Sequence, residues 1–239
     1  MTELYCAVPD ASSTFDRVAA EYDETIPAHV TRHYLRKRVE FARRVWPAGG
    51  HIMDLGCGTG SLSEALTHAG FRVSGIDRSL GMLGQAHDRA LAVACASADA
   101  LPWEDHTFDG AISVAVMHHL ATPSLVSDSI GEMVRVIKPG GHAVVWDHNP
   151  LNPYWPIFMR RLPQDDGSER LIGRRELRRC AARAGARVVR LAGLGWVPDF
   201  VPAPLIGIAG AVERAIEMLP GSGVLAAHNV FVLEKMTAR

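Results

Sequence analysis

The chain has 239 residues, of which 48% are hydrophobic and 21% are charged, and its formal net charge is −1. This composition is ordinary for a globular protein. A net charge so close to zero, without a basic stripe, argues against a nucleic acid as substrate or partner. The four cysteines are scattered and none forms a Cys-x-x-Cys pair. We therefore expect no metal site and no disulfide framework.

Neither the first residues of the chain nor its apolar stretches predict export or a membrane span. The first ten residues contain an acid and an early proline and lack an apolar core, which is not the pattern of a signal peptide. The most apolar stretch, residues 201–212, is too short to cross a bilayer. These features favour a reducing, cytoplasmic location.

The first two thirds of the chain predict alternating helices and strands. A helical pattern over residues 12–45 is interrupted by Pro27. Short apolar runs and helical patterns then alternate, and Pro139-Gly140-Gly141 predicts a turn before the fifth strand. The expected strands are 51–55, 71–76, 91–96, 108–114 and 142–146, and the helices between them are 61–69, 80–89 and 124–137. This alternation indicates βαβ units and a mostly parallel sheet.

The pattern changes after residue 147. Four prolines between residues 150 and 163 predict a loop with short turns at most. A helix over 173–183, a strand over 186–194, a helix over 202–219 with one apolar face and a strand over 229–234 follow. We expect a single domain over residues 1–239. It would comprise a helical cap (12–45), a binding core (48–147) and a substrate-side segment (148–239) that ends in an antiparallel strand.

The strongest motif is a glycine loop between the first strand and the next helix. Asp54 and Leu55 precede Gly56-Cys57-Gly58-Thr59-Gly60. Glycines in such a loop allow a sharp turn and a close approach of the backbone to a ligand. A dehydrogenase would show G-x-G-x-x-G, but Ser61 stands where the third glycine is required. The carboxylate of Asp54 suits a cationic group better than pyrophosphate, so a dinucleotide-binding dehydrogenase is disfavoured.

Two further acids follow the next two strands. Asp77 lies 21 residues after Gly56, the interval at which nucleotide-binding folds place an acid for the ribose hydroxyls. Asp99 follows the third strand, where a carboxylate can accept a hydrogen bond from an adenine amino group. The alternatives are a helix-capping acid for Asp77 and a solvated turn residue for Asp99.

Together, the segments DLGCGTG, GIDRS, ADALPW, FDGAISVAVMHHL and RVIKPGG resemble the class I S-adenosylmethionine (SAM)-dependent methyltransferases of quinone biosynthesis. The resemblance implies a Rossmann-like α/β sheet, SAM as cofactor and S-adenosylhomocysteine as product. It places Asp54, Gly56, Cys57 and Gly58 at the methionine end, Asp77 at the ribose and Arg78 and Met82 along the nucleoside. It also places Asp99 and Ala100 at the adenine edge, Ser113 beneath the methionine moiety and Tyr22, from a Phe15-Asp16…Tyr22-Asp23 pattern, as a lid.

Three histidines are candidates for a catalytic base. His118 and His119 follow the fourth strand, and His148 follows the fifth, at the edge where such folds bind ligands. Histidine titrates near neutral pH and can accept a proton from a hydroxyl or an acidic carbon. We rank His119 first, His118 second and His148 third. Because neighbours on an extended chain point in opposite directions, we expect only one of His118 and His119 to face the pocket.

The substrate side of the chain is rich in aromatic residues. Tyr154, Trp155, Phe158, Trp196, Phe200 and the apolar helix 205–219 predict a largely apolar acceptor pocket, with a packed lid or a dimer face as alternatives. The sequence therefore predicts O- or C-methylation of a small, moderately apolar metabolite. A homodimer is left open, as are two other functions: SAM-fold chemistry without methylation, such as a cyclisation, and a non-catalytic SAM-binding partner or regulator.

Overall fold

The computed structural model describes residues 14–89, 91–162, 165, 167 and 169–237, so residues 12 and 13 of the expected helical cap lie outside it. The cap consists of a short helix α1 (Thr14–Val18), a 3-10 turn (Tyr22–Glu24) and the long helix α2 (Ala28–Val45). Pro27 caps the N-terminus of α2, where the missing N–H of proline costs no helical hydrogen bond. The predicted break at this residue is confirmed.

The predicted alternation of strands and helices is confirmed, with shifts of one or two residues at most ends. The strands of the parallel part are β1 (His51–Leu55), β2 (Arg72–Asp77), β3 (Ala92–Cys95), β4 (Phe108–Val114) and β5 (Ile137–His148). The helices between them are α3 (Ser61–His68), α4 (Leu80–Asp88) and α5 (Pro123–Val136). The C-terminal part contains α6 (Trp155–Phe158), α7 (Arg174–Arg183), β6 (Ala186–Leu194), α8 (Ile206–Glu217) and β7 (His228–Lys235).

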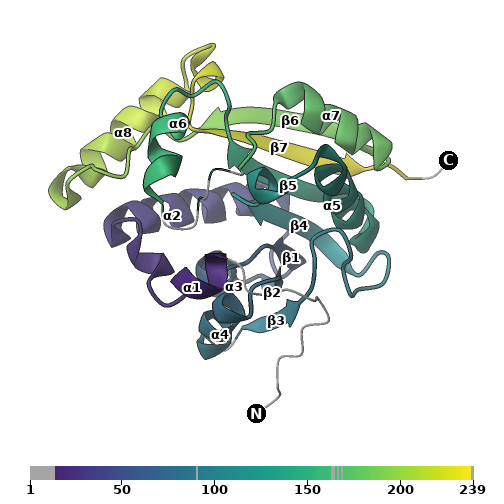
Figure 1. The fold of residues 1–239 in the computed structure, drawn as a ribbon. Helices are drawn as coiled ribbons and strands as arrows, with labels where there is room; N and C mark the ends of the chain where they lie inside the picture. Colours follow the sequence, from purple (N-terminus) through teal and green to yellow (C-terminus); the bar gives the residue numbers. More distant parts are fainter. Residues whose placement is uncertain (1–13, 90, 163–164, 166, 168, 238–239) are drawn as a thin grey trace.

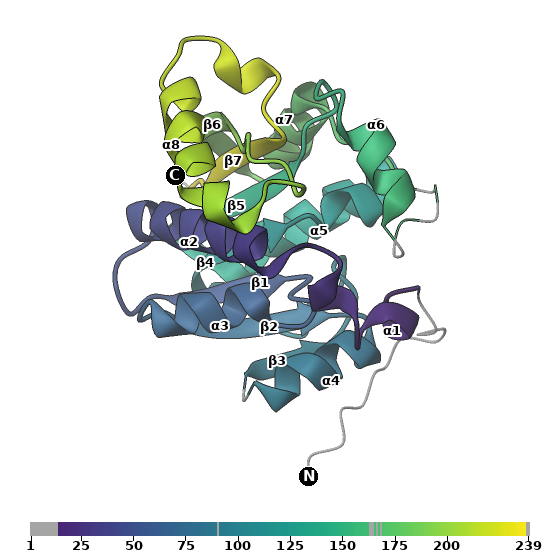
Figure 2. The ribbon, with the colours of Figure 1, turned by 90° about the vertical axis from the view of Figure 1, so that its left-hand side faces the viewer.

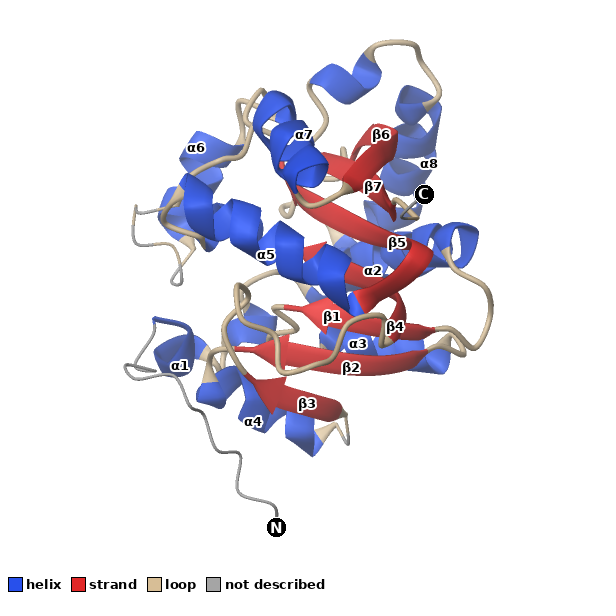
Figure 3. Ribbon diagram, turned by 90° about the vertical axis from the view of Figure 1, so that its right-hand side faces the viewer, coloured by secondary structure: helices blue, strands red, loops and turns tan. Residues whose placement is uncertain are grey.

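The seven strands form one sheet in the order β3-β2-β1-β4-β5-β7-β6 (Figure 3). β1 to β5 pair in parallel, whereas β7 is antiparallel to both β5 and β6. The prediction of a mostly parallel Rossmann-like sheet with an antiparallel last strand is confirmed. Because the chain order reverses between β1 and β4, the loops after these strands diverge and leave a crevice at their carboxyl ends.

Helices cover both faces of the sheet (Figure 1). Leu66 of α3 and Phe41 of α2 pack with Ile52 and Trp146 on one face, and Ile130 of α5 and Leu177 of α7 pack with strand residues on the other. Strands covered on both faces are expected to be apolar throughout, and four of the five residues of β1 are buried. Over β1 both faces of the sheet are covered, so a ligand can reach this strand at its end.

One turn prediction was wrong. Pro139-Gly140-Gly141 lies within β5, which begins at Ile137 rather than at His142. The ladder between β4 and β5 shifts register between the pairs Phe108–Ile137 and Gly110–His142, so the extra residues form an irregularity within the strand. Gly140 has a φ of +74°, a backbone conformation that glycine adopts without strain.

The apolar face of α8 points outward, contrary to the expectation that this helix helps to line a pocket. Ile208 is 65% exposed and Val212 is 52% exposed, whereas Glu213 is buried. In Figure 2, α8 lies directly above α2, and the two helices are in contact. Periodicity identified the helix but could not tell which of its faces meets the protein.

The cysteines of the chain differ in their chemical state. Cys57 and Cys180 are buried free thiols, whereas Cys95 is disulfide-bonded, which the spacing of the cysteines did not predict.

Among the described residues, no helix combines the length and the apolarity that crossing a bilayer requires.

Candidate active site

Two cavities meet at the carboxyl edge of the sheet, the edge beyond which α1 and α6 both lie in Figures 2 and 3. We call the first the Asp77 cavity; it has a volume of about 550 Å³ and reaches from Phe15 to Asp99. We call the second the aromatic cavity; it has a volume of about 450 Å³ and is lined by Tyr34, Trp155 and other aromatic residues. Both are lined by Tyr22, Gly56, Gly58, Val114, Ala115 and His119.

The glycine loop forms the boundary between the two cavities. Gly56 has a φ of +70°, and a Cβ atom added there would lie 2.3 Å from Val116. Gly58 has a φ of +54°, and an added Cβ would find no atom within 4 Å, so its surroundings are open to a ligand. The first position requires glycine for packing and conformation, and the second presents bare backbone to the cavities.

Asp77 holds the loop from the neighbouring strand. Its two carboxylate oxygens accept hydrogen bonds from the backbone N–H groups of Gly58 and Ser79, both at 2.9 Å. Arg78 and Met82 line the same cavity, Arg78 from an exposed position and Met82 from the first turn of α4. The structure thus brings together all three residues predicted to contact the ribose and its surroundings.

The loop after β3 places Asp99 in the Asp77 cavity but not Ala100. Asp99 accepts a hydrogen bond from the Ser97 hydroxyl. Ala100 is exposed and does not line the cavity, and its N–H donates to the carbonyl of Ser97 at 3.2 Å. Of the two residues expected at the adenine edge, therefore, only Asp99 lines this cavity.

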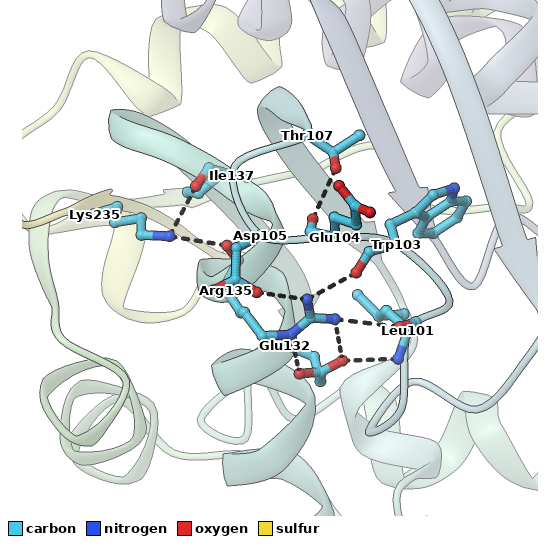
Figure 4. A network of polar contacts seen from close by, with 9 residues as sticks. All are labelled: Leu101, Trp103, Glu104, Asp105, Thr107, Glu132, Arg135, Ile137 and Lys235. Carbon is cyan, nitrogen blue, oxygen red and sulfur yellow. Dashed lines mark hydrogen bonds and ion pairs between the residues drawn. The ribbon is translucent and has the colours of Figure 1, made fainter.

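A polar network fixes the continuation of this loop (Figure 4). Arg135 of α5 donates to the carbonyls of Leu101 and Trp103 and to the Asp105 carboxylate, and Glu132 accepts from the Leu101 N–H at 2.8 Å. Lys235 of β7 donates in turn to the Arg135 carbonyl at 2.9 Å. The loop that carries Asp99 is thereby fastened to α5 and to the end of the sheet.

A buried carboxylate lies near the glycine loop, together with a half-buried arginine whose Nε is buried. Asp54 is 2% exposed, and burial raises its pKa to about 6, although the Ser63 hydroxyl donates to it at 2.6 Å. Arg38 of α2 lines the aromatic cavity, and burial lowers its pKa. Its buried Nε finds no acceptor among the described residues, and no ion pair joins it to a described carboxylate. A cation with a buried, unbonded nitrogen is costly unless a ligand pairs with it.

The remaining predicted cofactor residues differ in placement. Tyr22 lines both cavities, and burial raises the pKa of its hydroxyl to about 12. Cys57 lines the aromatic cavity, and burial raises the pKa of its thiol well above the usual value. Ser113 is buried within β4, opposite Leu55 of β1, and lines neither cavity.

Aromatic rings form much of the wall of the aromatic cavity. Tyr34 comes from α2, Trp155 and Phe158 come from α6, and Trp196 comes from the loop after β6. Tyr154 and Phe200, also predicted for this wall, line it as well. The aromatic residues expected to form an acceptor pocket therefore line one cavity, whereas Leu205, Ile208 and Val212, expected to contribute to it, are exposed.

His118 forms a buried dyad with Asp147, the penultimate residue of β5. His118 Nδ1 lies 2.6 Å from Asp147 Oδ1, and the His118 backbone N–H donates to Asp147 Oδ2 at 3.2 Å. Burial acts to lower the pKa of His118, but the Asp147 carboxylate outweighs it and the net shift is upward. The dyad fixes the imidazole so that Nε2 is the nitrogen left to exchange a proton.

The three histidines lie together, and the expectation that only one of the first two faces the pocket was wrong. His118 and His119 sit on a 3-10 turn (Met117–His119) rather than an extended chain, and both line the aromatic cavity. The His148 ring stacks between two other rings: its centroid lies 3.6 Å from that of Trp155 and 4.2 Å from that of His118. Burial, together with the neighbouring His118, lowers the pKa of His148 well below its usual value, so it is a weak base.

Sequence reasoning missed two acids that fasten the N-terminal segment over the Asp77 cavity. Asp16 of α1 accepts from the Ser79 hydroxyl at 2.5 Å and the Gly81 N–H at 2.9 Å. Asp23 accepts from the Thr59 hydroxyl at 2.7 Å. Both acids belong to the Phe15-Asp16…Tyr22-Asp23 pattern. The pattern therefore contains the residues that attach the N-terminal segment as well as Tyr22, the predicted lid residue.

Known proteins share both the sequence and the fold of this chain. Residues 53–145 match a family described as a methyltransferase domain. The demethylmenaquinone methyltransferase of Renibacterium salmoninarum is 33% identical over 165 residues, which cover 64% of this chain and 68% of that protein. The chain belongs to the class I SAM-dependent methyltransferases. SAM is accordingly its methyl donor.

Two further proteins resemble parts or all of the chain. The tRNA (carboxymethyluridine(34)-5-O)-methyltransferase of Arabidopsis thaliana is 38% identical over 99 residues, covering 41% of this methyltransferase and 24% of that protein. The CcbJ methyltransferase of Streptomyces caelestis has the same fold, with a TM-score of 0.69 at 15% identity, over 96% of this chain and 100% of that one.

The residues at the carboxyl edge fit SAM. Its amino-acid end has an ammonium and a carboxylate, and Asp54 and Arg38 supply one group of each opposite charge near the glycine loop. Asp77 and Asp99 line one cavity, and their carboxylates can accept hydrogen bonds from ribose hydroxyls and from an adenine amino group. The unpartnered Nε of Arg38 and the open space at Gly58 are the observations that call for a bound ligand.

Proposed function

We propose that this methyltransferase methylates an oxygen or an acidic carbon of a small, moderately apolar metabolite, with His118 as the base. The observation that supports this best is the buried His118–Asp147 dyad in the wall of the aromatic cavity. That cavity meets the Asp77 cavity at the glycine loop. An acceptor in the aromatic cavity would therefore face a methyl group held at the end of the Asp77 cavity.

Each part of the site would have a simple task. SAM supplies a methyl group that is already activated by its sulfonium, so the protein chiefly has to align the acceptor and exclude water. His118 would remove the acceptor proton, and Asp147 would hold the imidazole in the required tautomer and stabilise its protonated form. We place His118 ahead of His119 because His118 Nδ1 lies 2.6 Å from the Asp147 carboxylate, whereas His119 Nε2 lies 4.0 Å from the Asp165 carboxylate.

The walls of the aromatic cavity support a small acceptor. Aromatic side chains bind flat, apolar groups well, and the volume of about 450 Å³ suits a metabolite. One relative is named for demethylmenaquinone and another for a tRNA uridine. We favour the former kind of acceptor because a net charge of −1 gives no overall attraction for a polyanion such as tRNA.

Product analysis tests the proposal directly. The protein would be incubated with methyl-labelled SAM and separate acceptors: reduced 1,4-naphthoquinone, a simple phenol, histamine and a tRNA pool. We expect a mass gain of one methyl group on the naphthoquinol or the phenol. Methylation of the tRNA alone would overturn the small-molecule proposal, and SAM binding without any product would favour a partner or regulatory role.

SAM binding should weaken in acid. Asp54, whose pKa is about 6 in the free protein, would pair with the α-ammonium group only when ionised. The complex therefore binds fewer protons than the free protein, and affinity should fall by up to about tenfold per pH unit below pH 6. Calorimetry with S-adenosylhomocysteine from pH 5 to pH 8 measures this. Asp54→Asn should bind weakly with a flatter profile; a flat profile in the unmodified protein would contradict the pairing.

Replacing Arg38 should have opposite effects on binding and stability. Arg38→Met should weaken S-adenosylhomocysteine binding by about 10- to 100-fold, because a charge-assisted bond to its carboxylate is lost. The same variant should melt at a higher temperature without ligand, since a guanidinium with a buried nitrogen and no bonded carboxylate is costly. Arg36→Met, which changes an exposed arginine of the same helix, is the control. A variant with unchanged affinity would show that Arg38 serves another ligand.

A further inference from the structure

The loop that follows β6 forms one wall of the aromatic cavity. All six residues from Gly195 to Phe200 line it, and they include the rings of Trp196 and Phe200. The loop leaves the sheet after Leu194 and reaches the 3-10 turn Ala203–Leu205 before α8. Since it belongs to no strand or helix, its position depends on the groups that bond to its backbone.

Two carboxylates of α8 bind consecutive backbone N–H groups of this loop. Glu217 Oε1 accepts from the Gly195 N–H at 2.9 Å, and Glu213 Oε1 accepts from the Trp196 N–H at 2.7 Å. From the other side, the Tyr34 hydroxyl donates to the Val197 carbonyl at 2.7 Å. The loop is thus held at three successive residues by side chains of α2 and α8.

The same carboxylates tie α8 to α2. Glu213 Oε2 lies 2.7 Å from His33 Nε2 and 2.9 Å from Lys37 Nζ, and Glu217 Oε1 lies 2.5 Å from Lys37 Nζ. Glu213 is 2% exposed; burial acts to raise its pKa, but Lys37 and the Trp196 N–H lower it below the usual value. The carboxylate is therefore ionised and shared between α2 and the loop.

The orientation of α8 agrees with such a role. A helix that served only to cover the sheet would turn its apolar side chains inward. This helix instead turns Ile208 and Val212 to the surface and Glu213 and Glu217 to the protein. The inward face of α8 is therefore polar, and its carboxylates accept hydrogen bonds from the loop 195–200 rather than from the sheet.

We propose that Glu213, assisted by Glu217, is a positioning residue for the methyl acceptor. It would act by fixing the loop 195–200 against the aromatic cavity, without touching the acceptor itself. This inference rests on the proposed function in taking that cavity as the acceptor site. It assigns to α8 control over acceptor binding and none over SAM binding, because the described contacts of the two carboxylates are to α2 and to the loop 195–200, and not to Asp54, Asp77 or the glycine loop.

The test compares Glu213→Leu, which removes the bond to Trp196, with Glu213→Gln, which retains an oxygen acceptor. Glu40→Leu, at an exposed glutamate of α2, is the matched control. Amide hydrogen exchange over residues 197–201, S-adenosylhomocysteine binding and binding of 1,4-naphthoquinone by tryptophan quenching are measured for each. In Glu213→Leu we expect about tenfold faster exchange and about tenfold weaker naphthoquinone binding, with S-adenosylhomocysteine affinity unchanged. Glu213→Gln should recover most of both losses.

Exchange at residues 197–201 that is unchanged in Glu213→Leu would overturn the proposal, as would S-adenosylhomocysteine affinity that falls in step with naphthoquinone affinity. Should Glu213→Leu fail to fold, Glu217→Leu, at a side chain that is 14% exposed, provides the same readouts. If the unmodified protein does not bind naphthoquinone, the proposed acceptor class fails, whereas the exchange rates still decide the role of Glu213.

Discussion

Replacing His118 with alanine should lower turnover by about 10²- to 10⁴-fold and leave S-adenosylhomocysteine affinity near that of the unmodified enzyme. The reason is that His118 Nδ1 lies 2.6 Å from the buried Asp147 carboxylate, which orients the imidazole and raises its pKa. His118 lines the aromatic cavity and not the Asp77 cavity. Saturation kinetics with the acceptor identified by product analysis, together with calorimetry, separate the two effects.

The pH profile should identify the base. A base acts in its neutral form, so the rate should fall as pH drops through the pKa of His118, which Asp147 holds above its usual value. Asp147→Asn should move this fall to lower pH, because the carboxylate that raises the pKa is gone. His119→Ala is the matched control and should lose less than tenfold. A flat profile from acid to neutral pH, with activity retained in His118→Ala, would show that positioning alone suffices.

The parts of the fold that follow from local sequence were predictable. β1, β4 and β6 have the predicted bounds because apolar runs of that length, flanked by turn residues, have one stable state in a sheet. The start of β5 was not predictable from local sequence, since the irregular ladder around Pro139-Gly140-Gly141 depends on pairing with β4. A turn motif predicts local geometry and does not reveal whether a neighbouring strand continues past it.

The sequence predicted the part of the site that lies at the ends of single strands. It did not predict the contacts between segments that are distant in the sequence. The glycine loop and Asp77 lie at strand ends that the sequence pattern marks. The pairing of His118 with Asp147 joins residues 29 positions apart, and it depends on β4 and β5 ending side by side. Arg38 looks like one of several surface arginines of α2, because only the docking of that helix on the sheet buries its Nε.

Replacing Asp77 with alanine should weaken S-adenosylhomocysteine binding by more than a single lost contact would. Each hydrogen bond between the carboxylate and a ribose hydroxyl contributes on the order of 1.5–3 kcal/mol, or about 10- to 100-fold in affinity. The structure adds a second effect, because Asp77 also accepts from the N–H groups of Gly58 and Ser79 and so holds the glycine loop in shape. We therefore expect a loss beyond 100-fold and a lower melting temperature without ligand.

Calorimetry with S-adenosylhomocysteine and with adenosine separates the two effects of Asp77→Ala. Adenosine has the ribose but no amino-acid end, so its loss of affinity should report the ribose contacts, and the excess loss for S-adenosylhomocysteine should report the glycine loop. Asp109→Ala is the matched control: Asp109 also accepts a backbone N–H, from His51 at 2.8 Å, but at the opposite edge of the sheet. It should lower the melting temperature and leave both affinities unchanged. Unchanged adenosine affinity in Asp77→Ala would mean that the carboxylate only shapes the loop, and the ribose would then need another partner in the Asp77 cavity.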